Sequence, residues 1–187
     1  MEMLSLRQSE LVTMTTTANV VVQSLTVADA DAILDIYQQG MDTGHATFQE
    51  HAPSWNDWDQ SHLQTPRLGA FVDTELAGWA ALSPTSSRCV YAGVAEESVY
   101  VASKFAGMGI GLMLLQAIVA ASEEEGIWTL TAGVFPENEA SMKLHQKAGF
   151  KTLGRRERIG KMTFGPLADQ WRDVISFERR SDDPKFG

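Results

Sequence analysis

Three glycines at alternate positions are the strongest chemical signal in the sequence. Gly107, Gly109 and Gly111 lie in the segment FAGMGIGLML, between a strand-like run and an apolar helical pattern. Without a Cβ, these residues leave backbone N–H groups open to a ligand, and the positive N-terminus of the next helix points to the same place. The spacing G-x-G-x-G differs from the dinucleotide fingerprint and from the P-loop, and no Walker lysine follows. The sequence therefore predicts a phosphate or pyrophosphate site of another kind.

The elements around this loop predict a single α/β domain. The strand pattern ESVYVA precedes the loop, a helix is expected from about Gly109 to Glu125, and the strand pattern TLTAGVF follows. Such a β-α-β crossover makes the two strands parallel, within a mixed central sheet that is flanked by helices. The expected order over the whole chain is β-α-α-β-β-β-α-β-α-β-β. Its first helix starts after a Thr26 cap and is expected to end at Gly40.

The domain is expected to occupy residues 19–187, after a loose polar extension at residues 1–18. The chain has 187 residues and a net charge of −9, with a pI of about 4.8. This charge argues against a nucleic-acid surface, because phosphate neutralisation needs clustered Lys and Arg. The single cysteine, Cys89, excludes an internal disulfide and is typical of a reducing cytoplasm. It is expected to be a small packed side chain.

Several classes of partner are not expected for this chain. No apolar run has the length of a membrane span, and no basic-then-apolar leader is seen. The four histidines do not have the spacing of metal ligands. We therefore expect a cytoplasmic protein that needs no metal, nucleic acid or membrane.

Four segments together resemble the GNAT-type N-acetyltransferases: SVYVA, AGMGIG, GLMLL and PENEASMKLHQKAGF. The resemblance covers about residues 20–180. Within the family, the chain is similar to the branch that acetylates the α-amine of phosphinothricin and related amino acids. The segments that carry this similarity are TGHATF, SSRCVYAGVAEESVYV, LHQKAGF and WRDV. The chain is also similar to the arsinothricin members of this branch, in the segments GWAALSPTSSRCVYAG, GIWTL, FPEN and GRRERIG. The branch implies a GNAT-like fold, a role in resistance to such compounds, and a homodimer with sites near the subunit interface.

The resemblance also implies acetyl-CoA as the co-substrate. Its pyrophosphate would lie on the loop amides and its pantetheine arm between two splayed parallel strands. The family usually has Arg or Gln where this chain has Ala106, so one side-chain contact is lost while the backbone cradle remains. Lys104 matches a basic residue of relatives, and it is either a phosphate contact or a solvated loop lysine. The residues expected to contact acetyl-CoA are Val99, Tyr100, Val101, Lys104, Gly107, Met108, Gly109, Ile110, Gly111, Asn138 and Ser141.

Two further residues match catalytic positions of the branch. An ammonium is no nucleophile until a base takes its proton, and the match makes Glu96 that base, acting directly or through a water. Its neighbour Glu97 should face the other side of the strand. The match gives His145 as the proton donor to the departing CoA thiolate, where many relatives have a tyrosine. The alternatives are an exposed strand-end glutamate and a structural helix histidine. Asn138 is also expected to be a helix N-cap, and a strand amide such as that of Tyr100 to polarise the thioester.

The amino-acid pocket of the branch is matched by Arg88, Tyr91 and Phe48. An arginine offers a planar fork for a carboxylate or phosphinate, and the phenylalanine would supply an apolar wall. The alternatives are a surface arginine and a core aromatic. The arginines of the segment GRRERIG, at positions 155, 156 and 158, are expected to lie on an outer charged face.

Three functions remain open from the sequence. The first is an acetyltransferase of a small amino acid such as phosphinothricin, arsinothricin or methionine sulfoximine. The second is an acetyltransferase of protein N-termini or lysines. The third is a non-catalytic acyl-CoA sensor, which the loss of a side-chain contact at Ala106 favours and the presence of both Glu96 and His145 opposes.

Overall fold

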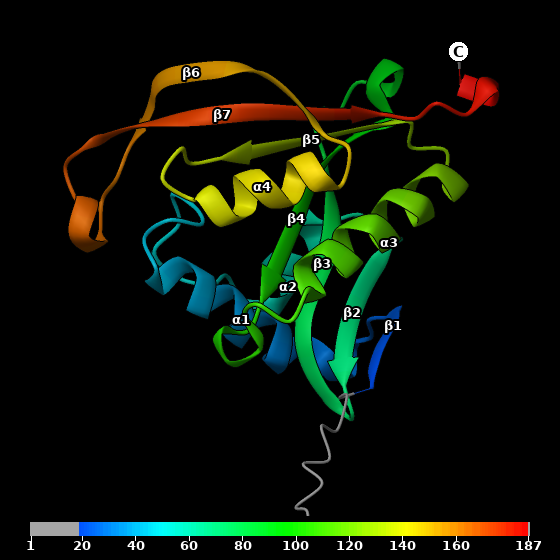
Figure 1. Ribbon diagram of the computed structural model, residues 1–187, viewed down its shortest axis with the longest axis horizontal. Coiled ribbons are helices and arrows are strands. Elements are labelled where there is room, and N and C mark those ends of the chain that lie inside the picture. The colour runs from blue at the N-terminus through cyan, green and yellow to red at the C-terminus, as the bar shows by residue number, and fades with distance from the viewer. Residues whose placement is uncertain (1–18, 187) are drawn as a thin grey trace, which may run out of the picture.

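A seven-stranded mixed sheet forms the centre of the protein (Figure 1). The computed structural model describes residues 19–186, so the extension expected at residues 1–18 lies outside the described part, as does Gly187. The strand order is β1-β2-β3-β4-β5-β7-β6, and only β4 and β5 are parallel neighbours. The strands are β1 (Val20–Ser24), β2 (Arg67–Val72), β3 (Glu75–Pro84), β4 (Val94–Val101), β5 (Thr129–Val134), β6 (Lys151–Lys161) and β7 (Trp171–Arg180).

Helices cover both faces of the sheet. Helices α3 and α4 pack on one face, and α1 and α2 lie on the other (Figure 1). The order of strands and helices confirms the one predicted from the sequence, and with it the α/β fold class. The helices are α1 (Ala30–Asp42), α2 (Trp55–Ser61), α3 (Ile110–Glu124) and α4 (Glu139–Lys147).

Two apolar cores hold the helices on the sheet. Leu114 and Ile118 of α3 are fully buried against the strands on one face. On the other face Ile33 of α1 and Trp58 of α2 pack around Trp79 of β3, whose indole N–H donates to the Ile33 carbonyl at 3.1 Å. Burying a side chain of this size contributes about 1.5–3 kcal/mol. The sheet is therefore a rigid platform that both helix layers share.

The first helix runs past the glycine at which it was expected to end. Thr26 does form the predicted capping box with Asp29, but over a short 3₁₀ turn that precedes α1. Gly40 lies inside α1, and a Cβ on it would come within 2.7 Å of the Tyr100 ring. The glycine thus permits a close approach of helix and strand, which the sequence pattern could not distinguish from a helix stop.

Candidate functional site

A large cavity opens where β4 and β5 separate. These parallel strands pair only over Val94–Glu96 and Thr129–Thr131, although they continue to Val101 and Val134. Beyond the paired part, the facing edges of the two strands have no ladder partner in the described sheet. Their backbone N–H and C=O groups are thus free to bond an extended ligand. The cavity at this place has a volume of about 1100 Å³, which suits a ligand of cofactor size.

The glycine loop closes one end of the cavity. Gly107 and Gly109 both have φ of +80°, a left-handed conformation that disfavours other residues. Gly109 is the N-cap of α3, so the free N–H groups of the first turn lie beside it. A Cβ at either glycine would meet no protein atom within 4 Å. The open space in front of positive-φ glycines and a helix N-terminus fits the phosphates of acetyl-CoA.

Most of the residues expected to bind the cofactor line this cavity, and two do not. Lys104 forms an ion pair with Glu75 of β3 and lies outside the lining. Met108, which is 47% exposed, also lies outside it. The lining includes Val99, Tyr100, Val101, Gly107, Gly109, Ile110, Gly111, Asn138 and Ser141.

Asn138 joins the cofactor side of the cavity to the loop after α1. As expected, it is the N-cap of α4: its Oδ1 accepts from the Ser141 backbone N–H at 3.1 Å. Its Nδ2 donates to the carbonyl of His45 at 3.2 Å. In this conformation one side chain fixes both the start of α4 and the loop that carries Phe48.

Glu96 lies in the cavity at the point where the strands begin to separate. An ideal Cβ on Gly133 of β5 would be 3.9 Å from Glu96 Oε1, so the carboxylate stands in front of a bare backbone. Burial and the neighbouring Glu97 raise the pKa of the Glu96 carboxyl, and the charge of Arg156 partly opposes them. A raised pKa makes the carboxylate a stronger base, as proton removal from an ammonium requires.

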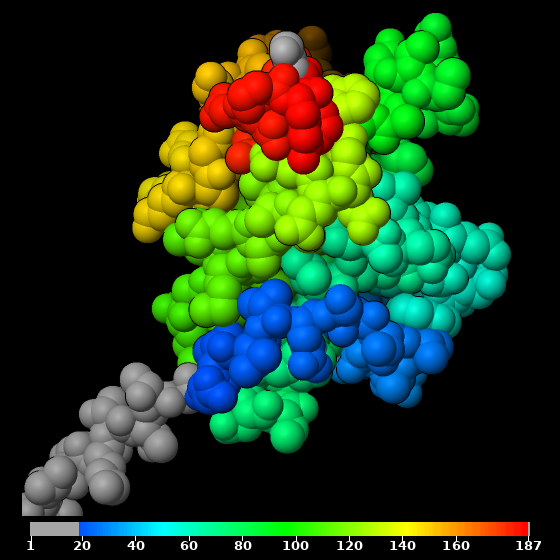
Figure 2. Space-filling model, turned by 90° about the vertical axis from the view of Figure 1, so that its right-hand side faces the viewer, coloured from blue at the N-terminus to red at the C-terminus, as the bar shows by residue number. Residues whose placement is uncertain are grey.

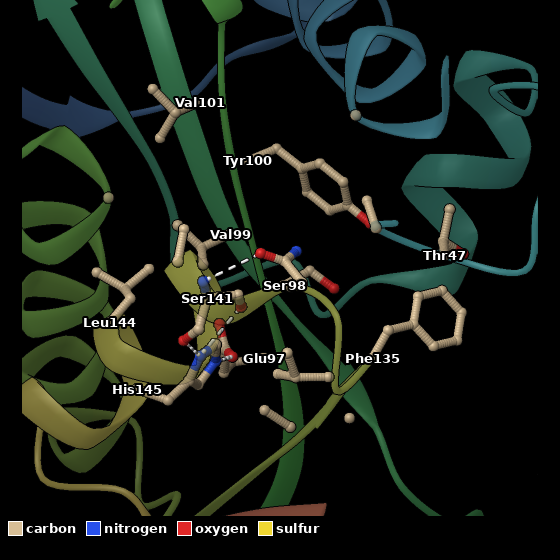
Figure 3. A pocket seen from close by; sticks show the side chains of 18 of the residues that line it. Thr47, Glu97, Ser98, Val99, Tyr100, Val101, Phe135, Ser141, Leu144 and His145 are labelled. Atoms are coloured by element: carbon tan, nitrogen blue, oxygen red, sulfur yellow. Dashed lines mark hydrogen bonds and ion pairs between the residues drawn. The ribbon is translucent and has the colours of Figure 1, made fainter. Parts of the chain in front are cut away.

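His145 is held in a buried pair that the sequence did not reveal. Its Nε2 lies 2.5 Å from Glu97 Oε1, and its Nδ1 donates to the Ser141 carbonyl at 2.7 Å (Figure 3). The side chains of Glu97 and His145 are only 2% and 3% exposed. Burial lowers the pKa of His145, but the hydrogen bond and charge of Glu97, together with the hydrogen bond to Ser141, outweigh it, so the pKa is raised overall.

Strand alternation puts the two neighbouring glutamates on opposite faces of β4, as expected. Glu96 lies on the side of α1, partly desolvated by the cavity yet still open to solvent, whereas Glu97 is buried beneath α4. The expected partner of Glu96 in catalysis, His145, therefore belongs to the other face, although both side chains line the same cavity. The second carboxylate oxygen of Glu97, Oε2, has no hydrogen-bond partner among residues 19–186.

The wall of the cavity on the α1 side is aromatic. Phe48 lines it and packs edge-on against Phe135, with ring centroids 4.8 Å apart. Beneath this pair Arg172 of β7 is buried, and its guanidinium lies 3.9 Å from the Phe135 ring centroid. Arg172 also donates to the Gly44 carbonyl at 3.0 Å and to Glu137 at 2.9 Å. The predicted apolar wall at Phe48 therefore packs on Phe135, which in turn packs on the buried guanidinium of Arg172.

Arg88 and Tyr91 do not line the cavity of their own chain. Arg88 caps the start of a short 3₁₀ turn, Cys89–Tyr91, in the loop between β3 and β4, and Tyr91 is the last residue of this turn. This segment projects from the body of the protein (Figure 2). The Arg88 guanidinium lies 5.6 Å from the Tyr91 ring centroid, and Tyr91 is 44% exposed. Cys89 is exposed as well, so the expectation of a packed thiol is wrong.

Arg156 is exposed, as expected for a charged face, and it also lines the cavity, which was not expected. Its neighbour Arg155 does lie on the outer side, where it pairs with Asp173. The sequence showed only alternating charges, and the register of β6 decided which of these side chains shares the sheet face of Glu96.

Comparison with known proteins decides the family. The sequence model of the acetyltransferase (GNAT) family matches residues 30–150. The chain belongs to this family. The GNAT resemblance predicted from the loop and strand motifs is thereby confirmed, and the chain is an acetyltransferase.

Several relatives match this GNAT chain over most of its length. The phosphinothricin N-acetyltransferase of Streptomyces coelicolor is 32% identical over 87% of this chain and 97% of its own. The L-methionine sulfoximine/L-methionine sulfone acetyltransferase of Pseudomonas aeruginosa is 27% identical over 83% and 91%. A phosphinothricin acetyltransferase structure from Sinorhizobium meliloti, in complex with AcCoA, superimposes with a TM-score of 0.75 at 24% identity, over 86% of this chain and 88% of its own. This last likeness concerns the fold.

Within residues 19–186 no cluster of three or more His, Cys, Asp or Glu side chains could hold a metal ion. In the same part of the chain, no helix is both long and apolar enough to cross a bilayer.

Proposed function

We propose that this GNAT enzyme transfers the acetyl group of acetyl-CoA to the α-amine of a small free amino acid. Candidate acceptors are phosphinothricin, arsinothricin and methionine sulfoximine, whose acetylation would give resistance to them. The names of the relatives in Streptomyces and Pseudomonas support this acceptor class. The exposed single cysteine suits action in a reducing cytoplasm.

The observation that best supports this proposal is the position of Glu96. Its carboxylate lies in the cavity beside bare Gly133, at the point where β4 and β5 part. An acceptor ammonium placed there gives its proton to Glu96, directly or through a water, and the free amine then faces the gap between the strands. The raised pKa of the Glu96 carboxyl matches it to this task.

The binding of acetyl-CoA is attributed to backbone more than to side chains. Acetyl-CoA supplies the acetyl group as a thioester. The free strand edges beyond Glu96 would hold the pantetheine arm, and a backbone amide such as that of Tyr100 would polarise the thioester oxygen. The amides around Gly107 and Gly109 would hold the pyrophosphate without the side chain that Ala106 replaces. Lys104, already paired with Glu75, would contribute little.

The His145–Glu97 pair is proposed to keep a proton beside the cavity. Because Nδ1 of His145 donates to a carbonyl and Nε2 faces a carboxylate, a proton is held between Nε2 and Oε1. A proton held in this pair could be delivered to a departing thiolate. His145 would deliver it only if Nε2 turned partly away from Glu97.

We also propose that the enzyme is a homodimer in which Arg88 and Tyr91 serve the partner's cavity. Both side chains stand on a projecting turn outside the cavity of their own chain. An isologous dimer would place this turn of one subunit over the acceptor end of the other. The arginine would then face the side-chain head of the acceptor.

An acceptor panel tests the proposed function. Thiol release from acetyl-CoA is measured with phosphinothricin, arsinothricin, methionine sulfoximine and glutamate, beside a lysine-containing peptide and a polyamine. The proposal expects kcat/KM to be highest for the amino acids with a tetrahedral side-chain head, and lower for planar glutamate. Preference for the peptide or polyamine would overturn the acceptor class. Tight binding of acetyl-CoA without thiol release for any acceptor would indicate a sensor instead.

A further inference from the structure

Among the described residues, Arg156 is the only arginine that lines the cavity. Its guanidinium makes no ion pair within 4 Å and no hydrogen bond with any residue from 19 to 186. Two other arginines are already paired: Arg155 with Asp173, and Arg172 with Glu137. A cavity-lining guanidinium therefore keeps its donors available for a ligand.

Register puts Arg156 on the same face of the sheet as Glu96. A Cβ on Gly133 would lie 3.1 Å from Val174 Cγ1 and 3.9 Å from Glu96 Oε1, so these three residues share one face. Val174 of β7 is the ladder partner of Arg156 of β6, and directly opposed residues of antiparallel strands point the same way. Glu96 and Arg156 thus stand at the two ends of a row across β4, β5, β7 and β6. The missing side chain of Gly133 leaves a gap in this row between Glu96 and Val174.

The two charges act on each other without touching. The positive charge of Arg156 lowers the pKa of the Glu96 carboxyl, against the larger raising effects of burial and of Glu97. No ion pair joins Arg156 to Glu96, since their charged atoms are more than 4 Å apart. A small group bound over Gly133 would lie between an anion and a cation.

We propose that Arg156 binds the α-carboxylate of the amino-acid acceptor while Glu96 takes the proton of its α-ammonium. This inference rests on the proposed function. In an α-amino acid the carboxylate carbon is about 2.5 Å from the amine nitrogen, from bond lengths of about 1.5 Å and a tetrahedral angle. An amine placed at Glu96 therefore brings the α-carboxylate of the acceptor close to the carboxylate of Glu96, and like charges repel.

A guanidinium at the other end of the row offsets that repulsion. Its planar fork matches a carboxylate with two parallel hydrogen bonds. A zwitterionic amino acid would lie across Gly133 with its ammonium toward Glu96 and its carboxylate toward Arg156. Peptide N-termini and polyamines have no carboxylate at this place. Arg156 would thus select free amino acids over both.

Matched variants on one strand test this role. Arg156→Gln removes the cavity guanidinium, and Arg158→Gln removes an exposed charge that acts on the outer-face Asp173. The KM of the best acceptor from the panel is compared with that of its α-carboxamide. We expect Arg156→Gln to raise the KM of the free acid by about ten- to a hundredfold, as for loss of a charge-assisted contact. For the carboxamide, Arg156→Gln and the unaltered enzyme should have similar KM values.

Two further readouts separate binding from a structural effect. The KM of acetyl-CoA should stay unchanged in both variants, and Arg156→Lys should restore only part of the loss because it keeps the charge without the fork. The acid limb of kcat/KM should move to higher pH in Arg156→Gln, because the charge that lowers the Glu96 pKa is gone.

Equal KM values for Arg156→Gln and Arg158→Gln in an active enzyme would overturn this inference alone. An equal loss for the acid and the carboxamide would overturn it too. If the unaltered enzyme acetylates no amino acid, the proposed function fails and this inference with it.

Discussion

Glu97 Oε1 lies 2.5 Å from His145 Nε2, between two side chains that are almost completely buried. Because the other ring nitrogen donates to the Ser141 carbonyl, the pair retains its shared proton within a shielded site. The contact links strand β4 to helix α4 across the wall of the cavity. It thus couples the chemistry of the site to the stability of the fold.

The first prediction follows from the sign of this coupling. The pKa of His145 is raised in the folded state, where Glu97 and the hydrogen bond to Ser141 together outweigh burial. Its stabilising contribution is therefore complete below the unfolded pKa, about 6.5, and is lost as the pH rises through the folded pKa. Urea unfolding should show this decline in the unaltered protein and not in Glu97→Gln.

NMR titration of His145 gives the matching site-specific check. In Glu97→Gln the charge partner is gone while burial remains, so the His145 pKa should fall below its usual value. An unchanged pKa in the variant would show that Glu97 does not hold the imidazole charge.

A second prediction concerns the glycine loop. Gly109→Ala places a methyl group in space that no protein atom occupies, and Gly126→Ala does the same at the far end of α3. Both glycines have φ of +80°, so each variant should lose about 1–2 kcal/mol of stability. Calorimetry should show acetyl-CoA affinity reduced about tenfold or more only in Gly109→Ala, since tenfold corresponds to 1.4 kcal/mol. Equal affinities in the two variants would refute the loop assignment.

A third prediction uses two glycines of β6. A Cβ on Gly160 would lie 2.7 Å from the Phe48 ring, so Gly160→Ala must displace the aromatic wall. The same change at Gly154 meets nothing within 4 Å. Steady-state kinetics should show a higher acceptor KM for Gly160→Ala, by about fivefold for roughly 1 kcal/mol of lost packing, and no change for Gly154→Ala. A rise in acetyl-CoA KM instead would place Phe48 on the cofactor side.

A fourth prediction tests whether the site is shared between subunits. Arg88→Ala and Glu96→Gln chains are each expected to have low activity alone. If Arg88 serves the partner's cavity, a mixed dimer has one intact site, and co-expression should recover about a quarter of the unaltered activity. Failure to recover activity in purified mixed dimers would place Arg88 in its own subunit's site, and a monomer in solution would exclude sharing.

The sequence predicted the order of elements because strong periodic patterns and turn residues agree along the chain. It also placed Glu96 and the glycine loop in one site, since both flank the same strand. The Glu97–His145 contact joins residues 48 positions apart, so no local pattern could reveal it. Alternation indicated only that Glu97 faces away from Glu96. The structure was needed to show that α4 brings His145 to that face of the strand.

The roles of the arginines were also beyond the sequence. Arg155 and Arg156 differ only in which face of β6 they occupy, and a register shift between Arg156 and Gly160 makes that face hard to infer. Arg88 and Tyr91 matched a substrate pocket by motif, yet the fold of one chain holds them on a projecting turn. A motif identifies residue types, whereas a binding site also depends on where the fold and any subunit contact place those residues.

The pH dependence of kcat/KM in Glu96→Gln tests the central claim most directly. With a preferred amino acid, the unaltered enzyme should lose activity on the acid side of the raised Glu96 pKa. Glu96→Gln should be slower by about 10²–10⁴-fold and lose that acid limb, while binding acetyl-CoA normally. The exposed Glu124→Gln on α3 serves as the control and should behave as the unaltered enzyme. A loss of less than about tenfold with the acid limb intact would contradict the assignment of Glu96 as the base.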